Sequence, residues 1–149
     1  MAEQVNETIA QISFKGYKVH RLEFRLNDNF YPKEKSKIEL DMDFDIDIGI
    51  DRQENIAVIS LRCLINKEYE SMNQPLFLDI IIQSLFSFES GLQDENLYNL
   101  LNTNAVAIVF PYLRSVISTV TVNCGVPPVI LPTLNIVELV KRKNKEKIS

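Results

Sequence analysis

The sequence predicts an α+β fold, in which a four-stranded antiparallel sheet carries a long helix and a short C-terminal helix on one face. Four segments before residue 91 have the apolar patterns of strands, whereas the segment after residue 104 repeats its apolar residues every three or four positions, as a helix does. A length of 149 residues suits one hydrophobic core. We therefore expect residues 1–149 to form a single domain, with flexible tails at 1–11 and 144–149.

Composition and charge exclude several classes of protein. Hydrophobic residues make up 46% of the chain, charged residues make up 24%, and the formal net charge is -4, so we expect a soluble protein without a nucleic-acid partner. The N-terminal segment is polar and lacks a basic region, and no run of about 18 apolar residues occurs, so neither a signal peptide nor a membrane span is expected. A cytoplasmic location without direct membrane insertion follows.

The first predicted strand covers residues 12–26 (ISFKGYKVHRLEFRL). Its apolar positions change parity near Gly16 and again near His20, which indicates a long strand interrupted by bulges. The next segment is polar and contains a proline, so it is predicted to be a connection. That connection holds two adjacent aromatic residues, Phe30 and Tyr31, which need cover from the sheet or from a partner.

Residues 37–51 (KIELDMDFDIDIGID) form the clearest predicted strand, with apolar residues on one face and acidic residues on the other. A calcium-binding loop is excluded, because Gly49 comes one residue late for an EF-hand and alternate isoleucines would point into the loop. Two interpretations of the acidic face remain. It is either an edge strand protected by charge or a docking face for a basic partner.

Two more strands are predicted at residues 56–68 and 76–90. The last strand has apolar residues at most even-numbered positions, which we expect to face the core. Its odd-numbered positions, which include Phe77, Ile81 and Leu85, are also half apolar. A sheet face in contact with water is usually more polar, so we expect a second subunit or another partner to cover this face.

Helical periodicity begins with a short predicted helix at Asp94. Asn104 is a suitable N-cap for the longer helix that follows, and Gly125 is placed to end it. Pro111 lies inside this pattern, where it removes one backbone hydrogen bond at a cost of about 3 kcal/mol. A kink at this proline, or a helix that starts near Phe110, is therefore expected.

The apolar face of the long helix is wider than one small sheet and a second helix are expected to cover, which predicts an oligomer. The residues expected at the oligomer interface are Tyr17, Val106, Val109, Leu113, Val116, Ile117 and Val120.

After the helix, three prolines hold the chain in an extended apolar path, and residues 135–143 are predicted to form the short C-terminal helix.

No pattern in the sequence indicates an enzyme. The single histidine, His20, has no recognisable catalytic partner. Cys63 and Cys124 form neither a disulfide framework nor a paired metal spacing, and the helix dipole would disfavour a thiolate at Cys124. The chain has four glycines and no glycine-rich phosphate loop. We expect no catalytic residue, no cofactor and no metal site.

Residues 110–139 (FPYLRSVISTVTVNCGVPPVILPTLNIVEL) resemble the C-terminal core of the SecB export chaperones. The shared order is an FPY in a helix, an arginine two residues later, a glycine, a proline-rich apolar strand and a short helix led by asparagine. The resemblance extends more loosely through residues 37–43 (KIELDMD) and 76–88 (LFLDIIIQSLFSF), so that it covers roughly residues 12–140.

The resemblance implies first and second strands that lie apart in the sheet, a crossover loop between them, and a dimer of dimers formed through the long helix. It also implies an ATP-independent cytoplasmic holdase that binds unfolded polypeptide clients in apolar grooves and delivers them to the export machinery. The client groove would be lined by Phe30, Tyr31, Leu76, Ile136, Leu139 and Val140.

Docking of the export motor SecA, or of another partner, would use Phe77 and Asp79. The family's docking zinc is carried by SecA, so none is assigned to this chain. Arg21 and Arg25 align where the family has acidic residues that help to hold SecA, which weakens this expectation.

The groove is also less aromatic than in the family, because Glu34 aligns with a common tryptophan and Ile136 with a frequent phenylalanine. Two alternatives to a general export chaperone remain. One is a SecB-like chaperone dedicated to a single client, such as the antitoxin of a toxin-antitoxin pair. The other is a non-chaperone oligomeric scaffold with closed grooves.

Overall fold

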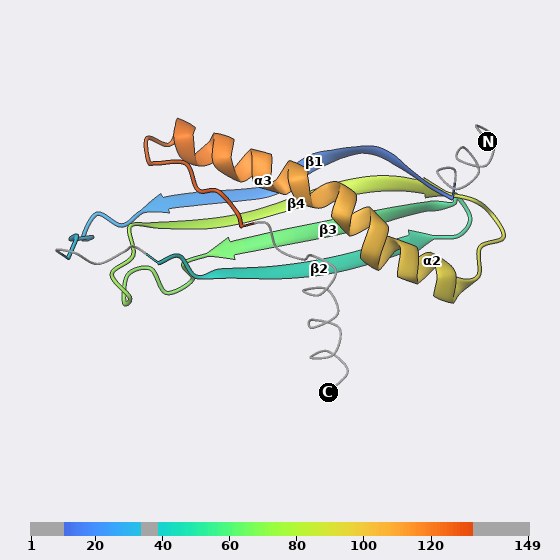
Figure 1. Cartoon of the computed structure of the whole chain (residues 1–149), viewed down its shortest axis with the longest axis horizontal. Helices are drawn as coiled ribbons and strands as arrows, with labels where there is room; N and C mark the ends of the chain where they lie inside the picture. The colour runs from blue at the N-terminus through green and yellow to red at the C-terminus, as the bar shows by residue number, and fades with distance from the viewer. Residues whose placement is uncertain (1–10, 34–38, 133–149) are drawn as a thin grey trace.

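The computed structural model describes residues 11–33 and 39–132. Four antiparallel strands form one sheet in the order β1-β4-β3-β2, and a long helix lies diagonally across one face (Figure 1). The strands are β1 (Ile12–Leu26), β2 (Met42–Asp51), β3 (Ile56–Ile65) and β4 (Leu76–Phe88). Consecutive strands β1 and β2 lie at opposite edges, so the chain must cross the whole sheet between them. The expected separation of the first two strands is confirmed.

Strand β1 contains the bulges that its sequence predicted. Its pairing register with β4 shifts between Phe14 and Tyr17 and again between Val19 and Arg21. Gly16 lies at the first shift with a φ of +117°, a conformation that suits glycine. The predicted bounds of the other strands were too wide, because β2 starts at Met42 and β3 and β4 end at Ile65 and Phe88.

The helix begins earlier than predicted. The segments α2 (Asp94–Leu100), η1 (Leu101–Ala105, a π-helical turn) and α3 (Val106–Asn123) form one continuous helix. Asn104 therefore lies in the π turn and is not an N-cap, and no new helix starts near Phe110. Pro111 is accommodated inside α3. Length and apolar composition would also let this helix span a membrane, but here one side of it is buried against the sheet, as in a core helix.

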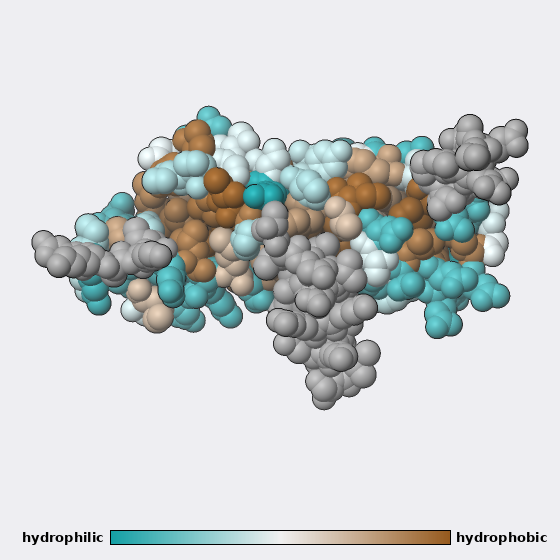
Figure 2. Space-filling model, in the orientation of Figure 1, coloured by the Kyte–Doolittle hydropathy of each residue, from teal (hydrophilic) through white to brown (hydrophobic). Residues whose placement is uncertain are grey.

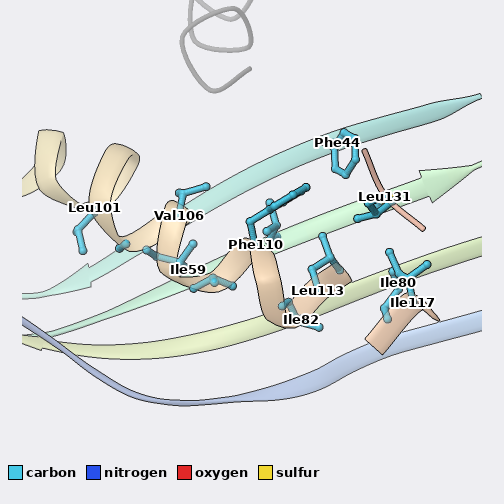
Figure 3. Packing of buried hydrophobic residues seen from close by; sticks show 14 of the residues in the cluster. Phe44, Ile59, Ile80, Ile82, Leu101, Val106, Phe110, Leu113, Ile117 and Leu131 are labelled. Carbon is cyan, nitrogen blue, oxygen red and sulfur yellow. The ribbon is translucent and has the colours of Figure 1, made fainter. Parts of the chain in front are cut away.

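The core lies between this helix and one face of the sheet. Figure 3 shows helix side chains that include Val106, Phe110, Leu113 and Ile117 above sheet residues that include Ile82. The extended segment after α3 returns to the same core, where Leu131 is fully buried. Its backbone is held by the helix, because the amide of Val129 donates a hydrogen bond to Oγ1 of Thr121 at 2.9 Å.

The helix residues expected at an oligomer interface are instead covered by this chain's own sheet. Val106, Val109, Leu113 and Ile117 are fully buried inside the single chain, and Val116 and Val120 are partly buried against the same core. The strands are 10 to 15 residues long, so the sheet is large enough to cover this face without a second copy. The exposed apolar residues of α3 are Ile108, Tyr112 and Val122.

Candidate docking surfaces

The sheet face opposite the helix carries the odd-numbered side chains of β4. The register aligns one row across all four strands, because Asp45 pairs with Arg62, Arg62 with Ile81, and Ile81 with Arg21. Aspartates of β2 occupy one edge of this face, whereas basic residues of β1 occupy the other. A shallow hollow of about 330 Å³ crosses its middle, lined by His20, Asp45, Ile46, Asp47, Ser60, Arg62, Ile81 and Gln83.

Asp79 lies at the centre of this face but does not present its charge to solvent. Its side chain is only 2% exposed. Arg62 holds it with two bonds, from Nε to Oδ1 at 2.8 Å and from Nη2 to Oδ2 at 2.9 Å, and Arg21 adds a third from Nε to Oδ2 at 3.0 Å. Hydrogen bonds from Arg62 lower the pKa of Asp79, although burial opposes them.

Phe77 and Asp79, the two residues expected to dock a partner, both make contacts within the chain. Both oxygens of Asp79 are engaged by arginines, so this carboxylate positions Arg21 and Arg62 on the face. Phe77 is half-buried and packs against Tyr69, with ring centroids 5.6 Å apart. Sequence reasoning missed Arg62. The available signal was that it is the one charged residue in the ten-residue apolar strand β3.

The loop after β1 is fixed in place, although it carries exposed aromatic surface. Tyr31 is 62% exposed. Its backbone is held at both ends by the side chain of Asn73, which accepts a hydrogen bond from the Tyr31 amide at 3.2 Å and donates one to its carbonyl at 3.0 Å. Phe30 is half-buried, and its amide bonds to the carbonyl of Asn27 at 3.0 Å. Met72, beside Asn73, is also exposed.

The remaining predicted groove residues fall in different places. Leu76 is 4% exposed and belongs to the core, so it can serve a groove only as part of its floor. Ile136, Leu139 and Val140 lie outside the described residues, as do Glu34 and the predicted C-terminal helix. The structure therefore places Phe30 and Tyr31 together on an accessible loop.

A second apolar surface lies on the helix side of β1. Val19, Leu22 and Leu26 are 44%, 47% and 51% exposed, although the β4 residues paired with them are buried beneath the helix. Val122 and Ile130 add exposed apolar surface from the end of α3 and the segment after it. Figure 2 shows hydrophobic residues gathered on this face at the end where α3 finishes.

Aromatic contacts join β1 to the exposed side of α3. Tyr112 lies against Phe14 and Tyr17, with centroid distances of 5.2 Å and 5.1 Å. Tyr17, expected at an oligomer interface, is therefore half-buried beside an exposed residue of the helix. Through these contacts, the edge of β1 and the outer side of α3 form one continuous surface.

Comparison with known protein families identifies the family of this chain. The family model described as preprotein translocase subunit SecB matches residues 7–147. The chain belongs to the SecB family. Members of this family are chaperones without catalytic activity, in agreement with the absence of catalytic patterns in the sequence. Within the described residues, no group of three or more His, Cys, Asp or Glu side chains is arranged to hold a metal ion.

Relatives of this SecB family member come from distant organisms. An uncharacterized protein of Methanocaldococcus jannaschii is 32% identical over 143 residues, which cover 91% of this chain and 90% of the relative. The protein-export protein SecB of Anaplasma phagocytophilum is 33% identical over 86 residues, 56% of this chain and 54% of that one. A SecB-like chaperone of Mycobacterium tuberculosis, solved with a ChAD peptide from an antitoxin, shares the fold. The two structures match with a TM-score of 0.69 at 18% sequence identity, and the matched region covers 87% of this chain and 94% of the M. tuberculosis chain.

Proposed function

We propose that this SecB family member is an ATP-independent cytoplasmic holdase that binds unfolded polypeptides at the loop after β1. The observation that supports this most directly is the exposed, rigidly held aromatic surface of Tyr31. A holdase must bind many sequences through apolar area and backbone contacts, without reading particular side chains. In this proposal Phe30 and Tyr31 contact the client, Leu76 forms part of the floor, and Ile136, Leu139 and Val140 complete the groove.

The loop is suited to this role because its order does not depend on a client. Asn73 already bonds both backbone groups of Tyr31, and the Asn27 side chain donates to the carbonyls of Tyr69 and Gln74 at 3.3 and 3.0 Å. Binding therefore requires little ordering of the loop, which lowers the entropic cost of capturing a chain. Burial of one large apolar side chain contributes about 1.5 to 3 kcal/mol.

We propose that a second surface joins copies of the chain into a dimer of dimers. It combines the apolar residues of β1 (Val19, Leu22 and Leu26) with Tyr112 and Val122 of the helix. Strand β1 is also an edge strand with a neighbour on one side only, among the strands that the structure describes. Replacing Leu22 with Asp should dissociate the assembly in light scattering. The matched control, Val58→Asp on the opposite face, should leave the assembly intact.

A chaperone dedicated to one client is the second candidate. It is favoured by the likeness of fold to the SecB-like chaperone that was solved with an antitoxin peptide. The sheet face opposite the helix also favours a dedicated chaperone, because Arg21 and Arg62 neutralise Asp79 where an acidic SecA-docking site was expected. Delivery to the export machinery would then need contacts other than the Asp79 carboxylate.

Capture from cytosol, followed by identification of the bound chains, separates these possibilities. The affinity-tagged protein is compared with the Phe30→Ser/Tyr31→Ser double variant in parallel. Many unrelated unfolded chains, lost in the variant, would support a general holdase. One antitoxin would support a dedicated chaperone. No client in either sample would indicate a scaffold with closed grooves and would contradict the proposal.

A further inference from the structure

The connection between β3 and β4, residues 66–75, is bonded to the loop that follows β1. Both segments lie at the end of the sheet where β1 and β3 finish and β4 begins (Figure 1). The amide of Asn27 donates to the carbonyl of Pro75 at 2.9 Å. The Asn27 side chain also donates to the carbonyls of Tyr69 and Gln74, at 3.3 and 3.0 Å. These hydrogen bonds join the two segments into one unit.

Asn73 makes the contact with the aromatic part of the loop. Its side-chain oxygen accepts a hydrogen bond from the Tyr31 amide at 3.2 Å, and its side-chain nitrogen donates to the Tyr31 carbonyl at 3.0 Å. The backbone of Asn73 has a φ of +48°, in the left-handed region that asparagine adopts more readily than most other residues with a side chain. This two-point contact fixes the position of Tyr31 relative to the connection between β3 and β4.

Met72, which precedes Asn73, is 61% exposed, nearly the same fraction as the 62% of Tyr31. Its amide donates to the carbonyl of Glu68 at 2.9 Å, so the apolar side chain is exposed on an ordered turn. Consecutive Cα atoms lie about 3.8 Å apart, so Met72 is close to the contact between Asn73 and Tyr31. With half-buried Phe30, three large apolar side chains therefore lie on adjoining segments, whereas isolated exposed apolar residues are usual on a protein surface.

We propose that Met72 contacts the client and that Asn73 is a positioning residue, so that the client site spans both segments. This inference rests on the proposed holdase function. The occupant is an extended apolar stretch of an unfolded polypeptide. The flexible, polarizable side chain of Met72 can adapt to client residues of different shape, while Tyr31 offers a rigid ring. Four extended residues span about 13 Å, which is long enough for one stretch to contact both segments.

The charges around Met72 also fit a client of this kind. Residues 67–70 carry both signs, with exposed Lys67, Glu68 and Glu70. Mixed charges favour neither an acidic nor a basic partner, so apolar contact decides what binds.

Asn73 acts through Tyr31 in this proposal. A loop that is already held loses little freedom when the client binds, which lowers the entropic cost of capture. Removal of the Asn73 side chain should therefore weaken client binding although no apolar contact is lost.

The affinity for a reduced, carboxymethylated protein, which stays unfolded, tests the contact of Met72. Met72→Ser should weaken binding by about three- to tenfold, because the apolar surface is lost. Met72→Leu keeps that surface and should bind within about twofold of the wild type. Val58→Ser is the control, since it removes an exposed apolar side chain from the opposite face of the sheet and should bind as the wild type does.

Asn73→Gly tests the positioning role, because glycine tolerates the left-handed backbone but lacks the side chain. Asn55→Gly is the matched control, since Asn55 has a φ of +54° in the turn between β2 and β3. Hydrogen exchange at the Tyr31 amide should be about tenfold faster in Asn73→Gly than in the wild type or the control. Client binding by Asn73→Gly should be about three- to tenfold weaker.

A double-mutant cycle separates positioning from general damage to the fold. In the Phe30→Ser/Tyr31→Ser background, Asn73→Gly should not change affinity further, because no aromatic side chain remains to be positioned. A further loss of affinity in that background, or an effect in Met72→Ser without one in Asn73→Gly, would overturn the role of Asn73. The melting temperature of each variant is measured in the same samples.

The same measurements distinguish failure of this inference from failure of the proposed function. Binding that is lost in Phe30→Ser/Tyr31→Ser but unchanged in Met72→Ser and Asn73→Gly would overturn this inference and leave the proposed function standing. No binding by the wild type would overturn both. A changed oligomeric state of Met72→Ser in light scattering, with unchanged client affinity, would assign Met72 to a contact between copies and would also overturn the inference.

Discussion

Replacing Asp79 with Asn should destabilise the protein and change how its stability depends on pH. Asn keeps the size of the side chain but puts an amide group, which also donates, against arginine donors. Three charge-assisted bonds are lost or weakened. Because the arginine side chains are 54% and 40% exposed, water compensates in part, so we expect a loss of about 2 kcal/mol. That corresponds to a melting temperature lower by roughly 4 to 8 °C for a chain of this size.

The pH dependence gives this prediction a second readout. Arg62 lowers the pKa of Asp79 in the folded protein below its usual value of 3.8, so the unfolded state binds the proton first as pH falls. The stabilisation is therefore fully present above about pH 4 to 5 and is lost as the pH drops through the folded pKa. The Asn variant should lack this part of the acid-induced decline.

Thermal unfolding followed by circular dichroism between about pH 2.5 and pH 7 measures both effects. Glu54→Gln is the matched control, because Glu54 is an exposed carboxylate in the turn between β2 and β3. If Asp79→Asn and Glu54→Gln had the same melting temperature at pH 7, the contacts of Asp79 with Arg21 and Arg62 would contribute nothing measurable to stability, and the reasoning would be refuted.

Three further predictions concern the loop, the thiols and the core. Phe30→Ser/Tyr31→Ser should weaken affinity for a reduced, unfolded protein by about tenfold or more and keep the melting temperature; retained binding with collapsed stability would assign the pair to the core. Burial raises the pKa of the Cys63 thiol to about 12, so a maleimide at pH 8 should label Cys124 first and reach Cys63 only on unfolding, as mass spectrometry can show. Leu113→Ala should cost about 2 to 5 kcal/mol in denaturant unfolding, and a loss below 1 kcal/mol would contradict its placement in the core.

Strand positions could be predicted because alternation and parity shifts are local properties of the sequence. The pattern from Met42 to Asp51 and the two bulges in β1 follow directly from residue order. The helix start could not be predicted in the same way, because the polar residues 102–104 looked like a boundary. In the structure Asn102 donates to the carbonyl of Tyr98 and Thr103 donates to that of Asn99, so both side chains are satisfied within the helix.

Predicting the candidate sites requires the pairing register of neighbouring strands, and the periodicity of the sequence does not define that register. Asp79 meets Arg62 across one strand pair and Arg21 across another, at separations of 17 and 58 residues. No local pattern predicts that these strands align at those positions. The prediction that one sheet could not cover the apolar face of the helix was wrong for a related reason. The area that a sheet covers depends on how its strands align. The exposed aromatic loop was found from sequence, since two adjacent aromatics in a polar segment stand out locally.

Holdase activity is tested most directly by the refolding of a chemically denatured, slow-folding protein without ATP. An equimolar amount of the chaperone, counted as binding sites, should delay recovery of the native state, and the Phe30→Ser/Tyr31→Ser variant should restore most of the uninhibited rate. The Glu54→Gln variant serves as the control and should delay refolding as the wild type does. Refolding at an unchanged rate in the presence of excess wild-type protein, whose native fold is verified in the same sample, would contradict the proposed function.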